Sequence, residues 1–436
     1  MQEKIRIPYN FEPREYQLPL LRAIDDGIKR AVVVWHRRSG KDKTLINLVA
    51  KKMLERVGAY YYFFPTYNQG RKILWDGRDK SGFKFMDHIP EKIRKRTDNT
   101  QMLIEIANGS IFQIIGTDNI DSIVGTNPIG CVFSEYSLQD PRAWDFMRPI
   151  LAENGGWAIF NYTPRGENHG YSLYEMAKND PKWYVQLLTV DDTKVIPQSV
   201  LEQERKEIIE KDGNDALYQQ EYMCSFKVPI AGAYYASQLI KAQDEGRIGK
   251  VPHEPSLPVD TYWDLGINDA MSIWFIQNIG MENRVIDYLE VNGEGLVSVI
   301  KSLQDKPYVY GRHIAPHDIE VRELSTGKSR KEVAKSLGID FDVAPKLTLE
   351  DGIEAVRNIL ASCWFDEDKC RRGLNALKSY HKEYDEKDKT YRNHPEHDWS
   401  SNGSDAFRYF AVSGKKNKWK YQDPGGVKPF IPGMLA

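Results

Sequence analysis

The chain has 436 residues, of which 41% are hydrophobic and 28% are charged, and its net charge is −2. This length suits two or three domains of ordinary size, each able to bury its own core. The nearly neutral charge excludes a uniformly basic nucleic-acid-binding protein, so any contact with a polyanion must use local basic patches. No run is apolar enough to span a bilayer, no secretory signal is present, and the four cysteines show no zinc spacing. We therefore expect a soluble cytosolic protein with reduced thiols and no membrane segment.

Apolar runs recur through the first half of the chain, and each ends at a turn signal. Several are continuous rather than alternating, which is typical of parallel strands buried on both faces. Helical patterns lie between some of them, over residues 43–56 and 69–76. These observations predict an α/β sheet with its chemistry at the carboxyl ends of the strands. The expected strands are residues 31–35, 59–64, 110–115, 130–133 and 157–160.

The first of these runs ends in a short loop that contains Gly40 and Lys41, and an apolar-periodic helix follows. This order is typical of a phosphate-binding loop (P-loop), where backbone N–H groups and one lysine hold nucleotide phosphates. The loop departs twice from the pattern G-x-x-x-x-G-K-S/T. The loop lacks the first glycine of this pattern, and Asp42 replaces the serine or threonine. An ordinary turn with a Gly-Lys pair explains this segment equally well when it is taken alone.

Two later strand ends carry polar residues. Glu135 follows the run 130–133, as in a Walker B element, which delivers a carboxylate to magnesium and the attacking water. The usual first acid of that element is replaced here by Ser134, and a surface acid is the alternative reading of Glu135. The segment 161–166 follows the next run and includes Thr163, which could sense the γ-phosphate; a plain turn is equally compatible.

Asp42 and Ser134 suggest an exchange of roles. A P-loop hydroxyl and a Walker B carboxylate normally hold Mg²⁺ together. The exchange keeps the local charge and the number of oxygen ligands nearly constant, which Mg²⁺ requires more than a particular side chain. Asp42 is therefore a candidate metal ligand, with a surface ion pair to Lys41 as the alternative.

From about Val259 the pattern changes to three consecutive strands joined by turns, followed by alternating strands and helices. A meander followed by α/β units fits the ribonuclease H-like fold. The expected strands are residues 261–264, 271–279, 284–290 and 312–316, and the expected helices lie near 331–337 and 353–363.

Three acids fall where a nuclease of that fold needs them. Asp264 ends the first of these strands, Asp318 follows the fourth, and Asp405 opens a late helix. Two metal ions about 3.5–4 Å apart need carboxylates around them, because hard cations prefer oxygen ligands. Asp405 could instead cap its helix, and Asp264 could start a turn.

An ATPase followed by a ribonuclease H-like nuclease resembles the large terminase subunit of tailed bacteriophages, a motor that pumps the genome into the capsid and cuts it. The resemblance covers about Phe11 to Val412. It implies a P-loop (RecA/ASCE-like) ATPase domain followed by a ribonuclease H-like domain. The matching motifs are residues 36–42 (Walker A), 132–136 (Walker B), 163–166 (coupling), and 316–320 and 404–409 (second and third nuclease motifs).

In the ATPase half, the resemblance implies that Lys41 binds phosphate, that Glu135 is the catalytic glutamate and that Arg37 stabilises the transferred phosphoryl group. Thr163 would belong to the coupling switch. Gln17 would read adenine, because the segment Pro13-Arg-Glu-Tyr-Gln17 resembles the Q-motif of helicase-like ATPases. The candidate nucleotide-binding residues are Gln17, Arg38, Ser39, Gly40, Lys41, Asp42, Lys43 and Thr163.

In the nuclease half, Asp264, Asp318 and Asp405 would be catalytic metal ligands, with Glu290 as a possible accessory acid. The implied cofactors are ATP and Mg²⁺, or Mn²⁺ at the nuclease site. The implied partners are double-stranded DNA, a capsid portal protein, a small terminase subunit and further copies in a ring. The implied location is the host cytoplasm, transiently at the procapsid portal.

One departure concerns the arginine that many relatives carry in an L-R-G-x-x-P stretch before Walker B, thought to act on the neighbouring subunit. Here the segment 122–128 has Val124 at that position. Such an arginine must therefore come from elsewhere, and Arg142 and Arg148 are the candidates.

The expected organisation is an ATPase domain with a lid over residues 1–226, a linker over 227–258, a nuclease domain over 259–413 and a flexible docking tail over 414–436. A helicase-like repair or restriction ATPase with a fused nuclease is the alternative. Helicases of that kind need two motor folds, and the residues before Val259 suffice for one. A non-catalytic scaffold with a decayed nucleotide site is a third possibility.

Overall fold

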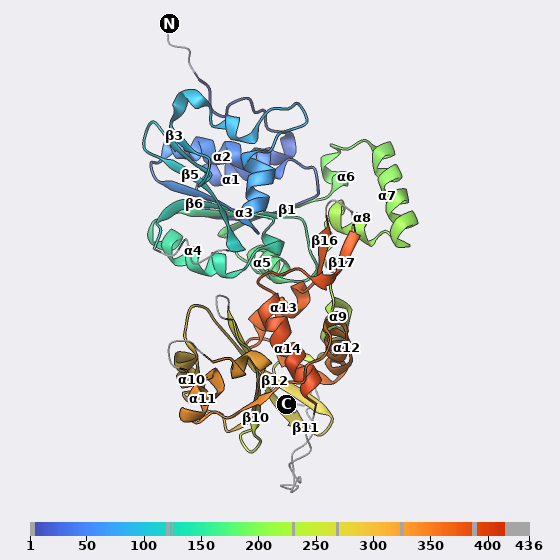
Figure 1. Cartoon of the computed structure of the whole chain (residues 1–436). Coiled ribbons are helices and arrows are strands. Elements are labelled where there is room, and N and C mark those ends of the chain that lie inside the picture. Colours follow the sequence, from blue (N-terminus) through green and yellow to red (C-terminus); the bar gives the residue numbers. More distant parts are fainter. Residues whose placement is uncertain are drawn as a thin grey trace. The chain divides into compact units, whose positions relative to one another are not determined.

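The chain folds into two compact units, Met1–Pro229 and Ile230–Ala436 (Figure 1). The computed structural model describes residues 5–118, 123, 125–228, 232–266, 270–322, 327–385 and 390–414. The predicted docking tail therefore lies, apart from Gly414, outside the described residues. Within the described part of the chain, no helix is both long and apolar enough to cross a membrane.

The first unit is built on an eight-stranded sheet with the order β3-β4-β5-β2-β6-β7-β1-β8. From β5 to β8 every neighbouring pair is parallel, and only β3, β4 and β5 pair antiparallel. Strand β7 therefore lies between β1 and β6, so the carboxyl ends of these three strands are adjacent. The strands are β1 (Arg30–Trp35), β2 (Ala59–Phe64), β3 (Arg94–Asp98), β4 (Leu103–Ile106), β5 (Ile111–Gly116), β6 (Pro128–Ser134), β7 (Trp157–Tyr162) and β8 (Trp183–Leu188).

Helices cover both faces of this sheet (Figure 1). Successive side chains of a strand point to opposite faces, so each strand packs against both layers of helices. Val33 packs with α1 (Leu18–Asp25) and α2 (Lys41–Glu55), whereas Val32 packs with α4 (Arg142–Glu153) and α5 (His169–Lys178). On the second face the rings of Phe63, Phe133 and Phe160 stack at 4.7 and 4.8 Å between centroids. Each fully buried phenyl ring contributes about 1.5–3 kcal/mol. Continuous apolar strands are thus explained by burial on both faces.

A small helical segment follows β8 and corresponds to the predicted lid. It comprises α6 (Val190–Thr193), α7 (Gln198–Asp212) and α8 (Ala216–Glu221). Its helices enclose a small core of their own, made of Val190, Leu201, Ile208 and Tyr218. The predicted helix over 69–76 is also present, as α3 (Tyr67–Gly70) and a π-helical turn (Arg71–Trp75).

The second unit is built on a seven-stranded sheet with the order β14-β13-β10-β11-β12-β15-β9. Strands β10, β11 and β12 form an antiparallel meander, β13 adds parallel to β10, and β14 adds parallel to β13. This is the strand order 3-2-1-4-5 of a ribonuclease H-like sheet, which confirms the predicted fold class. The strands are β9 (Ile248–Gly249), β10 (Val259–Asp264), β11 (Met271–Ile279), β12 (Glu282–Val291), β13 (Tyr310–Ala315), β14 (Phe341–Val343) and β15 (Cys363–Asp366).

Helices also cover both faces of the second sheet (Figure 1). Trp274 lies under α14 and donates its Nε1–H to the Gly403 carbonyl at 2.8 Å. Position 373 is a glycine because the Trp274 ring fills the space beside it. A Cβ there would lie 2.3 Å from this ring. One face carries α9 (Ala236–Asp244), α12 (Leu349–Ile359), α13 (Arg371–Ser379) and α14 (Ser401–Ser413). The other face carries α10 (Leu296–Gln304) and α11 (Arg330–Ser336). A separate two-stranded sheet, β16 (Lys382–Asp385) and β17 (Thr390–Pro395), lies between α13 and α14 in the chain.

The predicted strands agree with the observed ones to within two residues at each end. The predicted helix over 353–363 begins four residues earlier, at Leu349, because the Thr348 hydroxyl accepts the Asp351 N–H as an N-cap. Within the segment 227–258, expected to be a linker, α9 and β9 form part of the second unit, and β9 pairs with β15. A two-residue strand carries too little periodicity to be found in a sequence.

Candidate nucleotide and nuclease sites

The P-loop connects β1 to α2. Arg38 and Gly40 adopt left-handed backbone angles, with φ of +68° and +85°, and only glycine does so at no steric cost. The loop thereby delivers Lys41 to the first turn of α2, where its side chain is buried. Lys41 Nζ donates hydrogen bonds to the Trp35 carbonyl at 3.1 Å and to Thr163 Oγ1 at 2.7 Å. The lysine therefore joins the ends of β1 and β7.

Glu135 completes this group from the end of β6. Its Oε1 lies 3.6 Å from Lys41 Nζ, and its side chain is one-quarter exposed. Its backbone is left-handed, with φ of +56°, and its N–H donates to Asn161 Oδ1 at 3.3 Å. Such a conformation is strained for a glutamate and is typical of functional sites. The structure thus brings together three predicted site residues, Lys41, Glu135 and Thr163, at the carboxyl ends of adjacent strands.

Ser39 provides a test of whether a nucleotide fits this loop. Its Oγ atom is buried and has no hydrogen-bond partner among the described residues. A buried polar group without a partner costs about 1–3 kcal/mol, which a phosphate oxygen at the loop would relieve. Backbone N–H groups at the start of α2, together with Lys41, supply the positive potential that phosphates require. The loop is therefore chemically suited to a nucleotide.

Asp42 contacts two hydroxyl groups. Its Oδ1 accepts hydrogen bonds from Tyr62 Oη and from Ser134 Oγ, both at 2.7 Å. Burial raises the pKa of Tyr62 well above its usual value, and the Asp42 charge beside it adds to the rise. Asp42 therefore lies against the Walker B strand, and the alternative of a surface ion pair with Lys41 is not what the structure shows. A carboxylate and a hydroxyl in contact are suitable oxygen ligands for a hard divalent cation.

Gln17 and Lys43 lie beside the loop with their polar ends engaged by the protein. Gln17 accepts the Arg14 N–H at 3.0 Å and donates to the Ser39 carbonyl at 3.2 Å. Lys43 donates to Asp79 at 2.7 Å, and this hydrogen bond is the main reason why the pKa of Asp79 is lowered. Both residues therefore support the P-loop in this state, and a direct contact to a nucleotide would require them to exchange partners.

Arg37 pairs with a lid residue that the sequence did not single out. Its Nη1 lies 3.6 Å from Glu221 Oε2 at the end of α8, and Arg165 Nη1 of the coupling motif lies 2.5 Å from Glu221 Oε1. Burial opposes ionisation of Glu221, but the Arg165 and Arg37 charges outweigh it, so its pKa is lowered. The sequence holds no signal for this cluster, because Glu221 is remote from both arginines along the chain.

His36 also joins the P-loop to the lid. Its Nε2 lies 2.6 Å from Thr193 Oγ1, and its backbone N–H donates to the Leu188 carbonyl at 3.0 Å. Burial lowers the pKa of this imidazole to about 4. His36 is thus a neutral packing residue that ties the P-loop to α6.

The candidates for a trans-acting arginine lie on α4. Arg142 is held by Asp140 through two hydrogen bonds of 2.5 and 2.8 Å, whereas Arg148 is exposed. An exposed side chain can reach a neighbouring molecule without breaking a buried pair. Arg148 is therefore the better candidate of the two.

The three predicted nuclease acids come from elements that meet at one end of the second sheet. Asp264 ends β10, and Asp318 lies in a short 3-10 turn (His317–Glu320) just after β13, the parallel neighbour of β10. Asp405 lies in α14, which packs on β10. Burial raises the pKa of Tyr409, and the nearby charges of Asp264 and Asp405 add to the rise.

These acids do not form a metal site as they stand. Among the described residues, no group of three or more His, Cys, Asp or Glu side chains is placed so that it could hold a metal ion. Asp405 Oδ1 is instead 2.8 Å from Arg408 Nη1 and accepts a hydrogen bond from Tyr380 at 3.3 Å. Burial raises the pKa of Asp405 although Arg408 opposes the rise. Asp318 is half-exposed and lies 3.2 Å from His317.

Glu290, the possible accessory acid, is buried in a structural network. It accepts hydrogen bonds from Arg372 at 2.7 Å and from Tyr288 at 2.6 Å. The Arg372 guanidinium also lies 4.5 Å from the Trp399 ring centroid. These contacts pair the Glu290 carboxylate with Arg372 and hold it between β12, α13 and the segment before α14.

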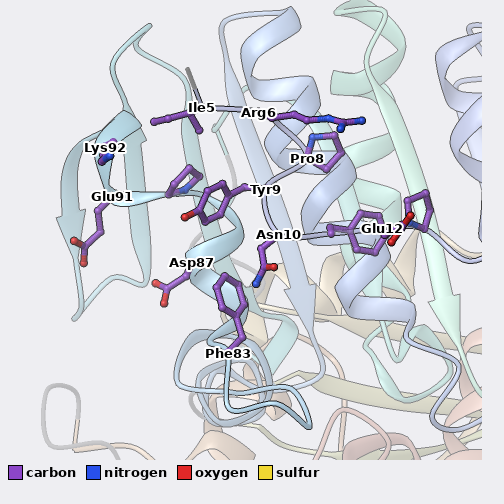
Figure 2. Close-up of a pocket in the computed structure, with 13 residues that line it drawn as sticks. Ile5, Arg6, Pro8, Tyr9, Asn10, Glu12, Phe83, Asp87, Glu91 and Lys92 are labelled. Carbon is purple, nitrogen blue, oxygen red and sulfur yellow. The ribbon is translucent and has the colours of Figure 1, made fainter. Parts of the chain in front are cut away.

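Two of the cavities among the described residues lie away from the P-loop, and Figure 2 shows the larger of these two. The larger, about 1090 Å³, lies between the N-terminal segment and the turn before β3, and Figure 2 shows Arg6, Tyr9, Phe83 and Glu91 around it. It contains none of the predicted nucleotide-binding residues. The smaller, about 250 Å³, is bordered by His317, Arg408 and Tyr409, and thus adjoins the nuclease acids.

The fold and these sites define a chain with a P-loop ATPase-type unit followed by a ribonuclease H-like unit. No family model matches the sequence. The chain is 22% identical to the large terminase subunit of Escherichia phage T5 over 428 residues, which cover 93% of this chain and 92% of that protein. This similarity spans both units and confirms the resemblance inferred from the motifs.

Solved structures similar to this chain include domains of two large terminases. The ATPase domain of Thermus phage P74-26 large terminase is 18% identical, covers 51% of this chain and 99% of its own, and gives a TM-score of 0.41. The nuclease domain of the bacteriophage SPP1 large terminase, solved with bound Mn, is 16% identical, covers 37% of this chain and 92% of its own, and gives a TM-score of 0.29.

Proposed function

We propose that this protein is the large subunit of a viral DNA-packaging motor, which couples ATP hydrolysis to translocation of double-stranded DNA into a capsid and cleaves that DNA. The observation that carries the proposal is the meeting of Lys41, Glu135 and Thr163 at the ends of β1, β6 and β7. The ribonuclease H-like unit behind this site, and the similarity to the phage T5 protein along both units, support the nuclease part.

Each residue of the ATPase site has a distinct role in this proposal. Lys41 and the N–H groups of the P-loop bind the phosphates, which displaces Lys41 from Thr163 and Glu135. Glu135 then becomes available to orient the attacking water. Thr163 loses its hydrogen bond to Lys41 at the same time, so the coupling motif responds to the bound nucleotide. Mg²⁺, held by Asp42 with Ser134, would neutralise phosphate charge when bound.

The nuclease assignment rests on the carboxylates at the end of the second sheet. Asp264, Asp318 and Asp405 offer the oxygen ligands that Mg²⁺ or Mn²⁺ prefers. Because the described residues form no group of three metal-ligating side chains, the acids would have to move closer together to share a metal. Release of Asp405 by Arg408 is the change that such a site would need.

The further parts of the proposal concern partners. In this function the protein acts in the host cytoplasm, docks as a ring of copies on a capsid portal, and receives DNA from a small terminase subunit. The helicase-like alternative requires two motor folds, and the described chain contains one parallel sheet with the strand order of a P-loop ATPase.

The test is to measure ATP turnover and plasmid cleavage by the full chain, with and without double-stranded DNA and divalent metal. We expect DNA to stimulate ATP turnover and metal to be needed for both activities. When procapsids with their portal are added, ATP turnover should drive DNA into the procapsid and thereby protect it from added nuclease. Unwinding of a DNA duplex without a procapsid would instead favour the helicase-like alternative.

A further inference from the structure

The smaller cavity, about 250 Å³ in volume, lies beside the nuclease acids of the second unit. Three elements border it: the 3-10 turn that begins at His317, the loop over residues 344–348 that follows β14, and α14 through Arg408. Asp318 is the next residue after His317, and Asp405 lies one helical turn before Arg408. The cavity is therefore adjacent to carboxylates on which the nuclease assignment rests.

The loop over residues 344–348 is fixed at both ends. At its start, the Ala344 N–H donates to the Ala315 carbonyl at 2.9 Å, so the loop begins beside the end of β13. At its end, the Thr348 hydroxyl accepts a backbone N–H of the first turn of α12 at 3.1 Å and caps that helix. A short segment between two fixed ends has few conformations open to it. Lys346, in the middle of the loop, is thereby held at the border of the cavity.

Arg408 is the second cation at this cavity, and its position is fixed by packing. Its side chain lies directly against α12, where a Cβ at Gly352 would be only 2.4 Å from Arg408 Cδ. Its Nη1 lies 2.8 Å from Asp405 Oδ1, and 17% of the side chain is exposed. A guanidinium carries five N–H donors, so the pair with Asp405 leaves donors for a second acceptor. Arg408 is therefore a fixed cation that can also bind an oxygen group in the cavity.

Lys346 brings a charge that the protein itself does not compensate. The side chain is exposed and makes no hydrogen bond or ion pair with the described residues. Its neighbour Leu347 is 52% exposed although it is apolar, and Tyr409 borders the same cavity. Cations next to apolar and aromatic side chains suit a unit of a nucleic-acid strand, whose phosphate is charged and whose sugar and base offer apolar surface.

The N-terminus of α12 is not part of this site, although it lies at the end of the loop. Its first turn carries Glu350 and Asp351, whose charges compensate the positive end of the helix dipole. Both carboxylates would repel an anion placed at the helix end. Binding of an anion in the cavity therefore depends on the side chains of Lys346 and Arg408.

We propose that this cavity binds a backbone phosphate of the DNA strand near the one that is cut, and that Lys346 and Arg408 position the strand. A DNA strand carries a negative charge at every nucleotide, and the carboxylates of the nuclease site repel it until metal ions are bound. Two cations beside the acids offset this repulsion and hold the strand so that the phosphate to be cut reaches the acids. This inference rests on the proposed nuclease function.

The first measurement is steady-state cleavage of plasmid DNA by the full chain and its Lys346→Gln variant. The KM for DNA should rise about threefold to tenfold while kcat stays within about twofold, because one phosphate contact is lost and the acids are unchanged. Lys346→Arg should restore the native KM, since it keeps the charge. The matched control is Lys301→Gln, which removes an exposed lysine of α10 on the other face of the sheet and should cleave as the native chain does.

The second measurement needs neither metal nor cleavage. All four native cysteines are buried, so Lys346→Cys adds a single exposed thiol to the full chain. The probe is a DNA duplex with a small mixed disulfide tethered to one backbone phosphate. The new thiolate attacks this disulfide, forms a protein–DNA disulfide and expels the small thiol. Lys346→Cys should be trapped at least about tenfold faster than Lys301→Cys, because DNA bound in the cavity raises the effective concentration of the tether.

Several outcomes would overturn the inference. An unchanged KM in Lys346→Gln does so, as does a raised KM that Lys346→Arg fails to restore. Equal rates of trapping for Lys346→Cys and Lys301→Cys also refute it, because they show that no phosphate is held near residue 346. A native chain that cleaves no DNA in the presence of metal would refute the nuclease function itself, whereas normal cleavage with an unresponsive Lys346→Gln refutes only the phosphate site.

Discussion

Ser134 donates its hydroxyl to Asp42 Oδ1 at 2.7 Å, and this contact joins the first turn of α2 to the end of β6. The two residues stand at the positions where a P-loop ATPase usually has a hydroxyl and a carboxylate, in the opposite order. Since Tyr62 donates to the same oxygen at 2.7 Å, the Asp42 carboxylate is oriented by two hydroxyl groups. The exchange of roles suggested by the sequence is therefore compatible with the geometry, because either order places both groups in contact.

The first prediction tests this exchange. Asp42→Ala should lower ATP turnover by at least about a hundredfold and raise the Mg²⁺ concentration needed for half-maximal rate, because the metal loses its carboxylate ligand. Asp42→Thr should be similarly impaired, since two hydroxyls supply too little charge. Asp42→Thr combined with Ser134→Asp should recover much of the rate. Steady-state ATPase assays across a Mg²⁺ titration measure this, and a double variant no better than Asp42→Thr would contradict the exchange.

The second prediction concerns Glu135. Glu135→Gln should lower ATP turnover by about 10²- to 10⁴-fold, because in the proposed function the Glu135 carboxylate orients the attacking water. Nucleotide affinity should stay within about threefold, since Lys41 and the P-loop are unchanged. Equilibrium binding and single-turnover assays separate the two effects. Loss of affinity with normal turnover would reassign Glu135 to binding.

The third prediction concerns the nuclease acids. Asp264→Ala, Asp318→Ala or Asp405→Ala should abolish metal-dependent cleavage of plasmid DNA, while ATP turnover continues in the other unit. Arg408→Ala serves as a matched comparison, because it removes the ion pair that occupies Asp405 at 2.8 Å. It should lower the metal concentration required by strengthening Asp405 as a ligand, provided that the variant melts as the native chain does. Near-normal cleavage by Asp405→Ala would remove that residue from the site.

The fourth prediction concerns stability and pH. Burial lowers the pKa of His313 from 6.5 to about 4, and its Nδ1 lies 2.6 Å from Thr261 Oγ1. Because the folded pKa is below the unfolded one, the unfolded chain binds the extra proton between these values. The contribution of neutral His313 to the free energy of unfolding is therefore complete above pH 6.5 and is lost as the pH falls towards 4. The free energy of unfolding should fall by about 1 kcal/mol between pH 7.5 and 5.5 for this reason.

Urea titrations of the second unit at these two pH values measure the fourth prediction. His313→Asn should be less stable at pH 7.5 but should lose about 1 kcal/mol less on acidification, because the titrating group is gone. A native chain with the same pH dependence as His313→Asn would show that His313 does not contribute.

The order of the elements in both units was accessible from the sequence. Apolar runs such as residues 130–133 and 157–160 are continuous because both faces of a parallel strand are buried, and this leaves a direct trace in composition. The meander after Val259 left a similar trace, because each strand ends at a turn. Lys41, Glu135 and Thr163 were accessible for the same reason, since each lies at the end of a recognisable strand.

Only the tertiary structure decided which side chains contact the site residues and hold them in place. Glu221 and Tyr62 contact the ATPase site from distant parts of the chain, and nothing in their local sequence distinguishes them from an ordinary lid acid and a strand tyrosine. Asp405 was found from its motif, but its pairing with Arg408 was not. A sequence pattern records the burial and turn chemistry of consecutive residues, whereas ion pairs and hydrogen bonds depend on distances of a few ångströms between segments that only the packed fold brings together.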